Sequence, residues 1–312
     1  MTRIVTLTLS PALDSATRVA HLCPDRKLRC SEPVYAPGGG GINVARAIRN
    51  LGGSALAMFP AGGPTGQHLH ELLQAEGVPC TALPIAAWTR QCFNVDEDAH
   101  GQQYRFVLPG ARLSEAEQQA LLAQLQALEA CDYLVVSGSL PEGLPSGFLP
   151  RLLQIAAERG ARCILDTSGP ALRQALERSE LFLIKPSLSE LGTLAGEEIS
   201  EPEHLVQTAS RLLRGSRCRA IMVSLGAQGA LLASPEGIEQ ISAPNVRKVS
   251  TVGAGDSLLA AMVLRLACGA SLSEAARYGV AAGSAAIMAQ GSNLCSREDT
   301  ERLYAWMSRH TG

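Results

Sequence analysis

Apolar and polar positions alternate along the chain with two different periods, and these predict where its strands and helices lie. Short apolar runs predict buried strands at residues 4–9, 55–60, 133–137, 163–165, 181–184 and 221–224. Between them, apolar residues recur at helical spacing at residues 41–51, 65–76, 114–129, 145–159 and 203–214. This alternation predicts an α/β chain with a mainly parallel sheet that is covered by helices on both faces.

Three parts of the chain depart from that alternation. Residues 253–309 carry the pattern of three successive helices. Residues 15–35 and 88–108 hold two-residue alternations, such as Phe93 with Val95, which predict antiparallel strands. A small sheet of this kind has an apolar face that nothing in the sequence covers, so we expect it to close over a ligand, to pair with another subunit, or both. We therefore expect a single domain over the whole 312-residue chain, with these two segments as its lid.

Composition and charge exclude several classes of protein. The chain has 27 Lys and Arg residues against 29 Asp and Glu residues, a formal charge of −2, which argues against a nucleic-acid binder that relies on a basic field. A hydrophobic fraction of 46% with 18% charged residues fits a large core and excludes wholesale disorder. No apolar run reaches the roughly 18 residues of a membrane helix, and no long apolar leader is present, so we expect a cytoplasmic protein without membrane contact.

Cysteine, histidine and lysine residues add candidates without deciding a function. The nine cysteines are scattered without a Cys-x-x-Cys pair, and we interpret them as reduced, mostly buried hydrophobes. His68 and His70 suggest a metal pair, but no third ligand is in view and we interpret them as ordinary helix residues. Only three of the basic residues are lysines: Lys27, Lys185 and Lys248. A bias toward arginine codons explains this scarcity, but a guanidinium does not imitate a compact ammonium, so all three are candidate ligand contacts.

A glycine-rich turn before an apolar helix carries the most informative chemistry. Gly253, Ala254 and Gly255 precede Asp256, and an apolar helix follows over residues 258–268. Free backbone amides at the start of a helix suit a phosphate. A carboxylate beside a phosphoryl group can accept the proton of an attacking hydroxyl while the amides stabilise the transferring group. The same turn also fits an ordinary helix cap with an aspartate in the first turn, and the turn alone does not decide between the two.

A second glycine-rich segment and an early aspartate predict a site for a polyol. Four consecutive glycines, residues 38–41, precede an amphipathic helix and either bring the backbone close to a ligand or act only as a hinge. Asn43 offers both a hydrogen-bond donor and an acceptor. Asp14 follows the first strand, and ligands of an open α/β sheet bind beyond the carboxyl ends of its strands. Its carboxylate can accept hydrogen bonds from two sugar hydroxyls.

Together, the glycine-rich segment near residue 40 and the Thr-Val-Gly-Ala-Gly-Asp segment that ends at Asp256 resemble the two signatures of the ribokinase/PfkB sugar-kinase family. Their order and their separation of about 210 residues are more specific than either motif alone. The similarity covers essentially the whole chain, including residues 136–141 and 280–286. It implies a ribokinase-like three-layer α/β/α fold with a mainly parallel central sheet and a small β-sheet lid.

The resemblance implies ATP-dependent transfer of a phosphoryl group to a sugar phosphate. Similarity over the whole chain favours the 1-hydroxyl of fructose 6-phosphate as the acceptor, which gives fructose 1,6-bisphosphate and ADP in glycolysis. By resemblance, Asp256 is the base and the backbone of Gly253, Ala254 and Gly255 forms the anion hole. Fructose 1-phosphate and tagatose 6-phosphate stay open as acceptors within the family. An alternative of a different class is a sugar-phosphate sensor without catalytic activity.

The resemblance also assigns binding contacts, residue by residue. The sugar hydroxyls would contact Asp14, Gly38, Gly39 and Asn43. The phosphate of the substrate would contact Arg90, Arg105 and Ser139, although Arg105 equally fits an ordinary surface arginine of the lid. The nucleotide would contact Lys27, Lys185, Ser187, Ser224, Gly226, Gly229, Lys248, Val280 and Ser284. Among these, Lys27 resembles a contact that reaches across a subunit boundary.

Two cation sites and the assembly follow from the resemblance alone. The family motif Asn-x-x-Glu, which organises magnesium through water, appears here with Ser187 in place of the asparagine and with Glu190 retained. We expect the shorter serine to weaken magnesium or nucleotide control modestly without loss of catalysis. A monovalent cation such as K+ would bind main-chain oxygens of Ser250, Val252, Ala286 and Gly291. We expect a homodimer joined through the lid sheet, and by resemblance a tetramer with ATP.

Overall fold

The main sheet of the computed structural model has nine strands, in the order β13-β12-β11-β10-β9-β8-β1-β4-β5. The structure describes residues 3–289 and 293–310. The seven strands from β11 to β5 pair in parallel, and β12 and β13 extend one edge by antiparallel pairing. The strand bounds are β1 (Ile4–Leu7), β4 (Leu56–Ala61), β5 (Cys80–Pro84), β8 (Tyr133–Ser137), β9 (Arg162–Asp166), β10 (Leu181–Ile184), β11 (Cys218–Ser224), β12 (Ala230–Ser234) and β13 (Gly237–Ile241).

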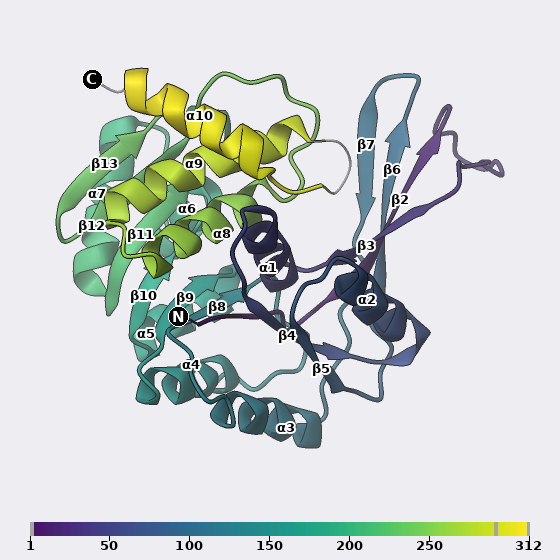
Figure 1. The fold of residues 1–312 in the computed structure, drawn as a ribbon, viewed down its shortest axis with the longest axis horizontal. Coiled ribbons are helices and arrows are strands. Elements are labelled where there is room, and N and C mark those ends of the chain that lie inside the picture. Colours follow the sequence, from purple (N-terminus) through teal and green to yellow (C-terminus); the bar gives the residue numbers. More distant parts are fainter. Residues whose placement is uncertain (1–2, 290–292, 311–312) are drawn as a thin grey trace.

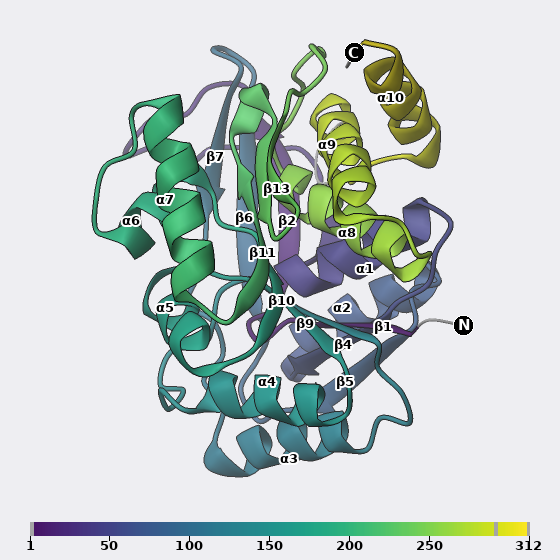
Figure 2. The ribbon, with the colours of Figure 1, turned by 90° about the vertical axis from the view of Figure 1, so that its left-hand side faces the viewer.

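Helices cover both faces of this sheet, as Figures 1 and 2 show. Each face has its own hydrophobic core, because alternate residues of the buried strands point to opposite sides. One core includes α1 (Gly40–Asn50), α2 (Gly63–Ala75), α8 (Ala254–Ala267), α9 (Leu272–Met288) and α10 (Arg297–His310). The other includes α3 (Glu115–Gln126), α4 (Phe148–Glu158), α5 (Gly169–Arg178), α6 (Leu188–Ala195) and α7 (Pro202–Gly215). The three-layer α/β/α prediction is confirmed.

A separate four-stranded sheet, in the order β3-β2-β6-β7, forms the lid and projects from one side of the main sheet (Figure 1). Its strands are β2 (Ala12–Val19), β3 (Val34–Gly38), β6 (Arg90–Glu97) and β7 (Gln102–Phe106). The predicted antiparallel pairing is present, since β2 pairs in this way with β3 and β6 with β7, but the two central strands, β2 and β6, pair in parallel, which was not predicted. Parallel neighbours need a long crossover, and here α1, β4, α2 and β5 lie between the two strands in the chain.

The observed elements differ from the predicted ones mainly in where they end, and some short strands and helices were not predicted at all. The strand predicted over residues 4–9 ends at Leu7, and the helices predicted over 114–129 and 145–159 are each shorter. The strands β5, β12 and β13 and the helices α5 and α6 were not predicted. The three helices predicted within residues 253–309 are all present. Among the described residues, no helix is both long and apolar enough to cross a membrane.

Candidate active site

The predicted site residues gather beyond the carboxyl ends of the parallel strands. Ser137, Asp166 and Ser224 are the last residues of β8, β9 and β11, and Lys185 directly follows β10. The glycine-rich start of α1 packs against the same edge, where Thr8 Oγ1 accepts a hydrogen bond of 2.8 Å from the amide of Ile42. Strands that run in parallel end at one edge of the sheet, so residues far apart in the sequence meet there.

Asp256 lies in the first turn of α8, beside backbone amides that have no partner within the helix. Gly253 caps this helix with a φ of 70°, a conformation that glycine adopts without strain. Asn43 Nδ2 donates a hydrogen bond of 2.9 Å to Asp256 Oδ2, which joins α1 to α8 across the site. Burial, together with the negative charge of Asp166, raises the pKa of Asp256 to about 6. The group is therefore ionised at neutral pH and is a better proton acceptor than an ordinary aspartate.

Lys185 places a buried ammonium beside that helix start. Its Nζ lies 3.1 Å from Asp166 Oδ1, and Ser137 Oγ lies within hydrogen-bond distance of Asp166 Oδ2, at 3.2 Å. Burial lowers the pKa of Lys185, but the charges of Asp166 and Asp256 outweigh it, so the pKa lies above its ordinary value. A Cβ on Gly255 would stand 3.2 Å from Lys185 Nζ. The cation thus lies directly against the amides that the sequence predicts to bind phosphate.

Asp14 occupies the inner end of the lid, on β2. Glycine is required beside it, because a Cβ on Gly38 would stand 2.3 Å from Asp14 Oδ2. Burial raises the pKa of Asp14 to about 6, and the charges of Arg90, Arg46 and Arg105 partly oppose that rise. The carboxylate therefore lies within the electrostatic reach of three arginines, in surroundings that suit a polyol carrying a negative group.

Arg90 begins β6 and points toward the main sheet. Its Nη2 donates hydrogen bonds of 2.9 Å to the Ser10 carbonyl and 3.3 Å to Ser139 Oγ, and its Nη1 donates one of 3.0 Å to the Leu108 carbonyl. Its Nε is buried and has no partner among the described residues. An unused buried donor on a guanidinium that is held in place suits an anionic ligand. Arg105 lies on the exposed strand β7, where Gln103 accepts its hydrogen bonds.

Six of the nine predicted nucleotide contacts line one cavity of about 450 Å3 next to α8, whereas Lys27, Lys185 and Ser187 do not. The predicted residues on its wall are Ser224, Gly226, Gly229, Lys248, Val280, Ser284, Ala254 and Gly255. Gly229 has a φ of 100°, and a Cβ there would stand 2.0 Å from the Ile241 carbonyl oxygen, so the turn requires glycine. The cavity opens at the start of α8, where Asp256 lies. A ligand in it can therefore place a phosphate against the helix amides.

Comparison with known proteins decides the family. Residues 8–299 match the model of the pfkB family carbohydrate kinases. The chain belongs to this family. It is 50% identical over 309 residues to the ATP-dependent 6-phosphofructokinase isozyme 2 of Escherichia coli strain K12. The aligned region covers 99% of this chain and 100% of that protein.

Two crystal structures of phosphofructokinase-2 from Escherichia coli resemble this pfkB family chain closely. Each comparison covers 99% of this chain and 100% of the other. The complex with potassium has a TM-score of 0.96 at 50% identity, and the complex with fructose-6-phosphate has a TM-score of 0.94 at 48% identity. The fold of this chain is the ribokinase-like arrangement of the family.

Ser187 and Glu190, which stand in the family's Asn-x-x-Glu motif, form the start of α6. Ser187 Oγ accepts a hydrogen bond of 3.3 Å from the Glu190 amide. Glu190 Oε2 accepts bonds of 2.7 Å from the Ser187 amide and 2.9 Å from its hydroxyl. This is a capping box, which stabilises the start of the helix. It occupies one carboxylate oxygen of Glu190, and Oε1 has no partner among the described residues.

Other predicted residues lie apart from the cavity or beyond the described residues. Lys27 lies in the exposed segment between β2 and β3 and does not line the cavity. The Ser250 amide donates a hydrogen bond of 3.1 Å to Ile287, which brings residues 249–252 beside the end of α9 and near Ala286. Gly291 lies outside the described residues.

Sequence reasoning missed some residues of the site. Asp166 forms an ion pair with Lys185 but belongs to no recognisable motif. Its position directly after a predicted strand was the one feature of the sequence that could have indicated a site residue, because ligands bind at the carboxyl ends of parallel strands. The irregular segment 243–246 lines the cavity and has no sequence pattern that marks it. Only tertiary packing brings this segment to the cavity.

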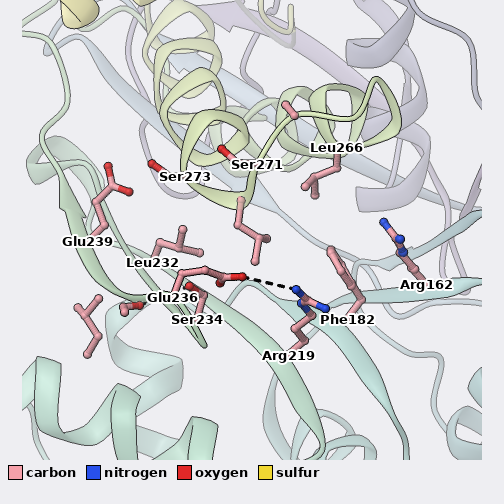
Figure 3. Close-up of a pocket in the computed structure, with 14 residues that line it drawn as sticks. Arg162, Phe182, Arg219, Leu232, Ser234, Glu236, Glu239, Leu266, Ser271 and Ser273 are labelled. Carbon is pink, nitrogen blue, oxygen red and sulfur yellow. Dashed lines mark hydrogen bonds and ion pairs between the residues drawn. The ribbon is translucent and has the colours of Figure 1, made fainter.

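A second cavity, of about 430 Å3, lies at the opposite end of the main sheet (Figure 3). Arg162, Phe182 and Arg219 line it from the amino-terminal ends of β9, β10 and β11, and Glu236 faces Arg219 at 3.5 Å. None of the predicted site residues lines this cavity. The two ends of the sheet therefore differ, and the residues predicted to bind phosphate lie at the end where α8 begins.

Proposed function

We propose that this pfkB family chain transfers the γ-phosphoryl group of ATP to the 1-hydroxyl of fructose 6-phosphate, forming fructose 1,6-bisphosphate and ADP. One observation carries the proposal. Asp256 lies at the amide-lined start of α8, with the nucleotide cavity on one side and Asp14 and Arg90 on the other. The names and bound ligands of the Escherichia coli relatives support the choice of acceptor.

On the sugar side, charge and geometry favour a phosphorylated acceptor. Arg90 has an unused buried donor and lies beside Ser139, so the two hold the substrate phosphate. Asp14 accepts hydrogen bonds from the sugar hydroxyls, and Asn43 can both donate hydrogen bonds to them and accept hydrogen bonds from them. Asn43 also fixes the Asp256 carboxylate, so the acceptor hydroxyl and the base share one partner.

On the nucleotide side, Asp256 takes the proton of the acceptor hydroxyl as the oxygen attacks the γ-phosphorus and the bond to the ADP oxygen breaks. The amides of residues 253–255 and the Lys185 ammonium stabilise the negative charge of the transferring group. Closure of the lid excludes water, which otherwise competes with the sugar for the phosphoryl group.

Two cations accompany the reaction in this proposal. Mg2+ would enter with ATP and neutralise phosphate charge, and Glu190 would hold one of its waters through the oxygen that the capping box leaves unused. By the family resemblance, the carbonyls of Ser250, Val252 and Ala286 would hold K+ together with Gly291, which lies outside the described residues. The potassium complex of phosphofructokinase-2 supports this second site.

The test is ADP formation by the purified enzyme with fructose 6-phosphate, fructose 1-phosphate and tagatose 6-phosphate, each assayed separately. We expect a clear preference for fructose 6-phosphate and no ADP from unphosphorylated fructose. Preference for either other ester would keep the mechanism and change the substrate. Tight binding of all three esters without ADP formation would instead support a sugar-phosphate sensor.

The exposed apolar side chains of the lid support a homodimer. Large exposed hydrophobic residues of the lid and its flanks are Leu28, Val34, Tyr35, Trp88, Phe93, Phe106, Val107 and Leu108. Phe93 and Phe106 are cross-strand partners on β6 and β7. A contiguous apolar surface of this kind marks an interaction site. We propose that the lid sheets of two subunits pack on one another; a tetramer with ATP stays a prediction.

A further inference from the structure

Two histidines and one glutamate converge at the far end of the lid, away from the nucleotide cavity. His21 follows β2, Glu97 ends β6, and His100 lies in the turn between β6 and β7. His21 Nδ1 lies 2.8 Å from Glu97 Oε1, and His100 Nδ1 lies 3.0 Å from Glu97 Oε2. One possible ligand atom from each of the three residues lies within 4.8 Å of the other two. We propose that these residues bind a divalent transition-metal ion, for which Zn2+ is the best match.

The ligand set and its spacing fit zinc. Two imidazole nitrogens and one carboxylate are a common zinc-binding set, with an open fourth position. Ligand atoms about 2.0–2.1 Å from a tetrahedral zinc lie roughly 3.3 Å apart. The two nitrogen–oxygen distances here, 2.8 and 3.0 Å, are somewhat shorter and involve different oxygens of Glu97, so the side chains must adjust slightly to share one ion. The ring centroids of His21 and His100 are 5.3 Å apart, so the two imidazoles are neighbours beside the carboxylate.

The backbone holds the three residues in place without an ion. The ladder between β2 and β6 continues beyond the strands, since the Asp98 amide donates to the Val19 carbonyl at 3.0 Å and the Ala99 amide to Ala20 at 3.1 Å. The Leu22 amide donates a hydrogen bond of 2.8 Å to Glu97 Oε1. A site that is assembled before binding loses little conformational freedom when the ion enters.

Charge and access also favour a cation here. The Glu97 side chain is 2% exposed, whereas those of His21 and His100 are 53% and 58% exposed. Within the described residues, no lysine or arginine pairs with Glu97. A buried carboxylate needs a compensating positive charge. The two exposed imidazoles leave the cluster open to solvent, so water can reach an ion bound there.

His68 and His70, the histidine pair that the sequence suggested as metal ligands, do not come together in this way. His68 contacts Tyr35 and Glu71, while His70 packs on Phe59. A double variant, His68→Ala with His70→Ala, is therefore a control that removes two imidazoles outside the cluster.

The test measures metal binding directly. Protein without a histidine tag, with Cys30→Ser and Cys268→Ser to remove exposed thiols, is stripped with a chelator and titrated calorimetrically with ZnCl2 in the absence of ATP. Visible absorption after titration with Co2+ reports the coordination geometry. We expect one ion per chain and at least tenfold weaker binding in His21→Ala, His100→Ala and Glu97→Gln. The His68/His70 control should bind as the parent does.

Three outcomes of the binding experiment overturn the proposal. They are no zinc binding by the parent protein, binding that the three variants leave unchanged, and equal loss in the control. A thermal stability that depends on pH but not on Zn2+ would assign the cluster to ion pairing instead, and also overturns it. His100→Ala changes an exposed turn residue, so the test stands even where Glu97→Gln fails to fold.

Discussion

At the scale of single residues, the candidate site holds two carboxylates whose ionised form is unfavourable in the folded protein. Asp256 is ionised in surroundings that favour its neutral form, as its pKa of about 6 indicates. Asp14 is shifted in the same direction, and three arginines oppose the shift. Residues that are strained or electrostatically unfavourable gather at functional sites because selection there acts on the reaction.

The pH dependence of turnover follows from Asp256. A base with a pKa of about 6 loses its function as it is protonated, so kcat at saturating substrates should rise with pH through about 6 and level off above it. Below that value the decline should approach about tenfold per pH unit. Steady-state rates over a pH series check this, and a rate that is flat between pH 5 and 7 would contradict the assignment.

Asp256→Asn should separate catalysis from stability. Turnover should fall by roughly two to four orders of magnitude while both substrates still bind, because the base is lost and the shape is kept. The raised pKa of Asp256 means that its contribution to stability is present below the ordinary value of 3.8 and is lost as pH rises through about 6. The variant should therefore be more stable than the parent at pH 7, by roughly 1–3 kcal/mol, and equal to it near pH 4. Denaturant unfolding at both pH values measures this.

Ser187→Asn tests the departure from the family motif. Asparagine caps a helix as well as serine does, so the free energy of unfolding should change little while the apparent affinity for Mg2+ or ATP changes. The matched variant Ser187→Ala loses the cap and should lose about 1 kcal/mol of stability. Identical kinetics in the parent and in Ser187→Asn would remove any role of this position in cation control.

At the scale of elements, the termini of strands and helices decide where the chemistry lies. The start of α8 supplies amides, the start of α1 supplies Asn43, and the lid strands β2 and β3 pair so closely that a side chain on Gly38 would meet Asp14. The motifs were recognisable in the sequence because close approach requires glycine. The distances between these groups could not be predicted from the sequence, because strand pairing and helix packing set them.

Gly38→Ala tests the pairing of β2 with β3. The added methyl group would stand 2.3 Å from Asp14 Oδ2, so the carboxylate must move away from its position in the site. We expect the KM for fructose 6-phosphate to rise about tenfold or more with a smaller change in kcat, since displacement of a binding group by about 1 Å is costly. Gly147→Ala is the control, because no heavy atom lies within 4 Å of a Cβ at that position. An unchanged KM in Gly38→Ala would exclude Asp14 from substrate binding.

At the scale of the whole molecule, the lid differs from the main sheet in the apolar surface that it exposes. Both faces of the main sheet are covered by helices, whereas the lid exposes large apolar side chains on neighbouring strands. Exposed apolar surface of this extent is stabilised when a second copy covers it. The sugar side of the site depends on the same strands, so assembly and substrate affinity should be coupled.

Phe93→Asp should disrupt the dimer and weaken substrate binding together. A carboxylate at this 38% exposed position cannot be buried unpaired in an apolar interface. Light scattering should show monomers, and the KM for fructose 6-phosphate should rise. Val206→Asp, at an equally exposed position on α7, should leave both unchanged. A fully active dimer of Phe93→Asp would show that the lid does not form the interface.

The sequence by itself determined the fold class, the longer helices and strands, and the two glycine-rich motifs. Each of these follows from local periodicity or from a need for glycine that a short segment reveals. Only the tertiary structure decided the parallel pairing of β2 with β6, the contact of Asn43 with Asp256 and the role of Asp166. It also brought His21, Glu97 and His100 together. The physical reason is the same in each case: these contacts join residues that are distant in sequence, and packing of the sheets and helices fixes their distances.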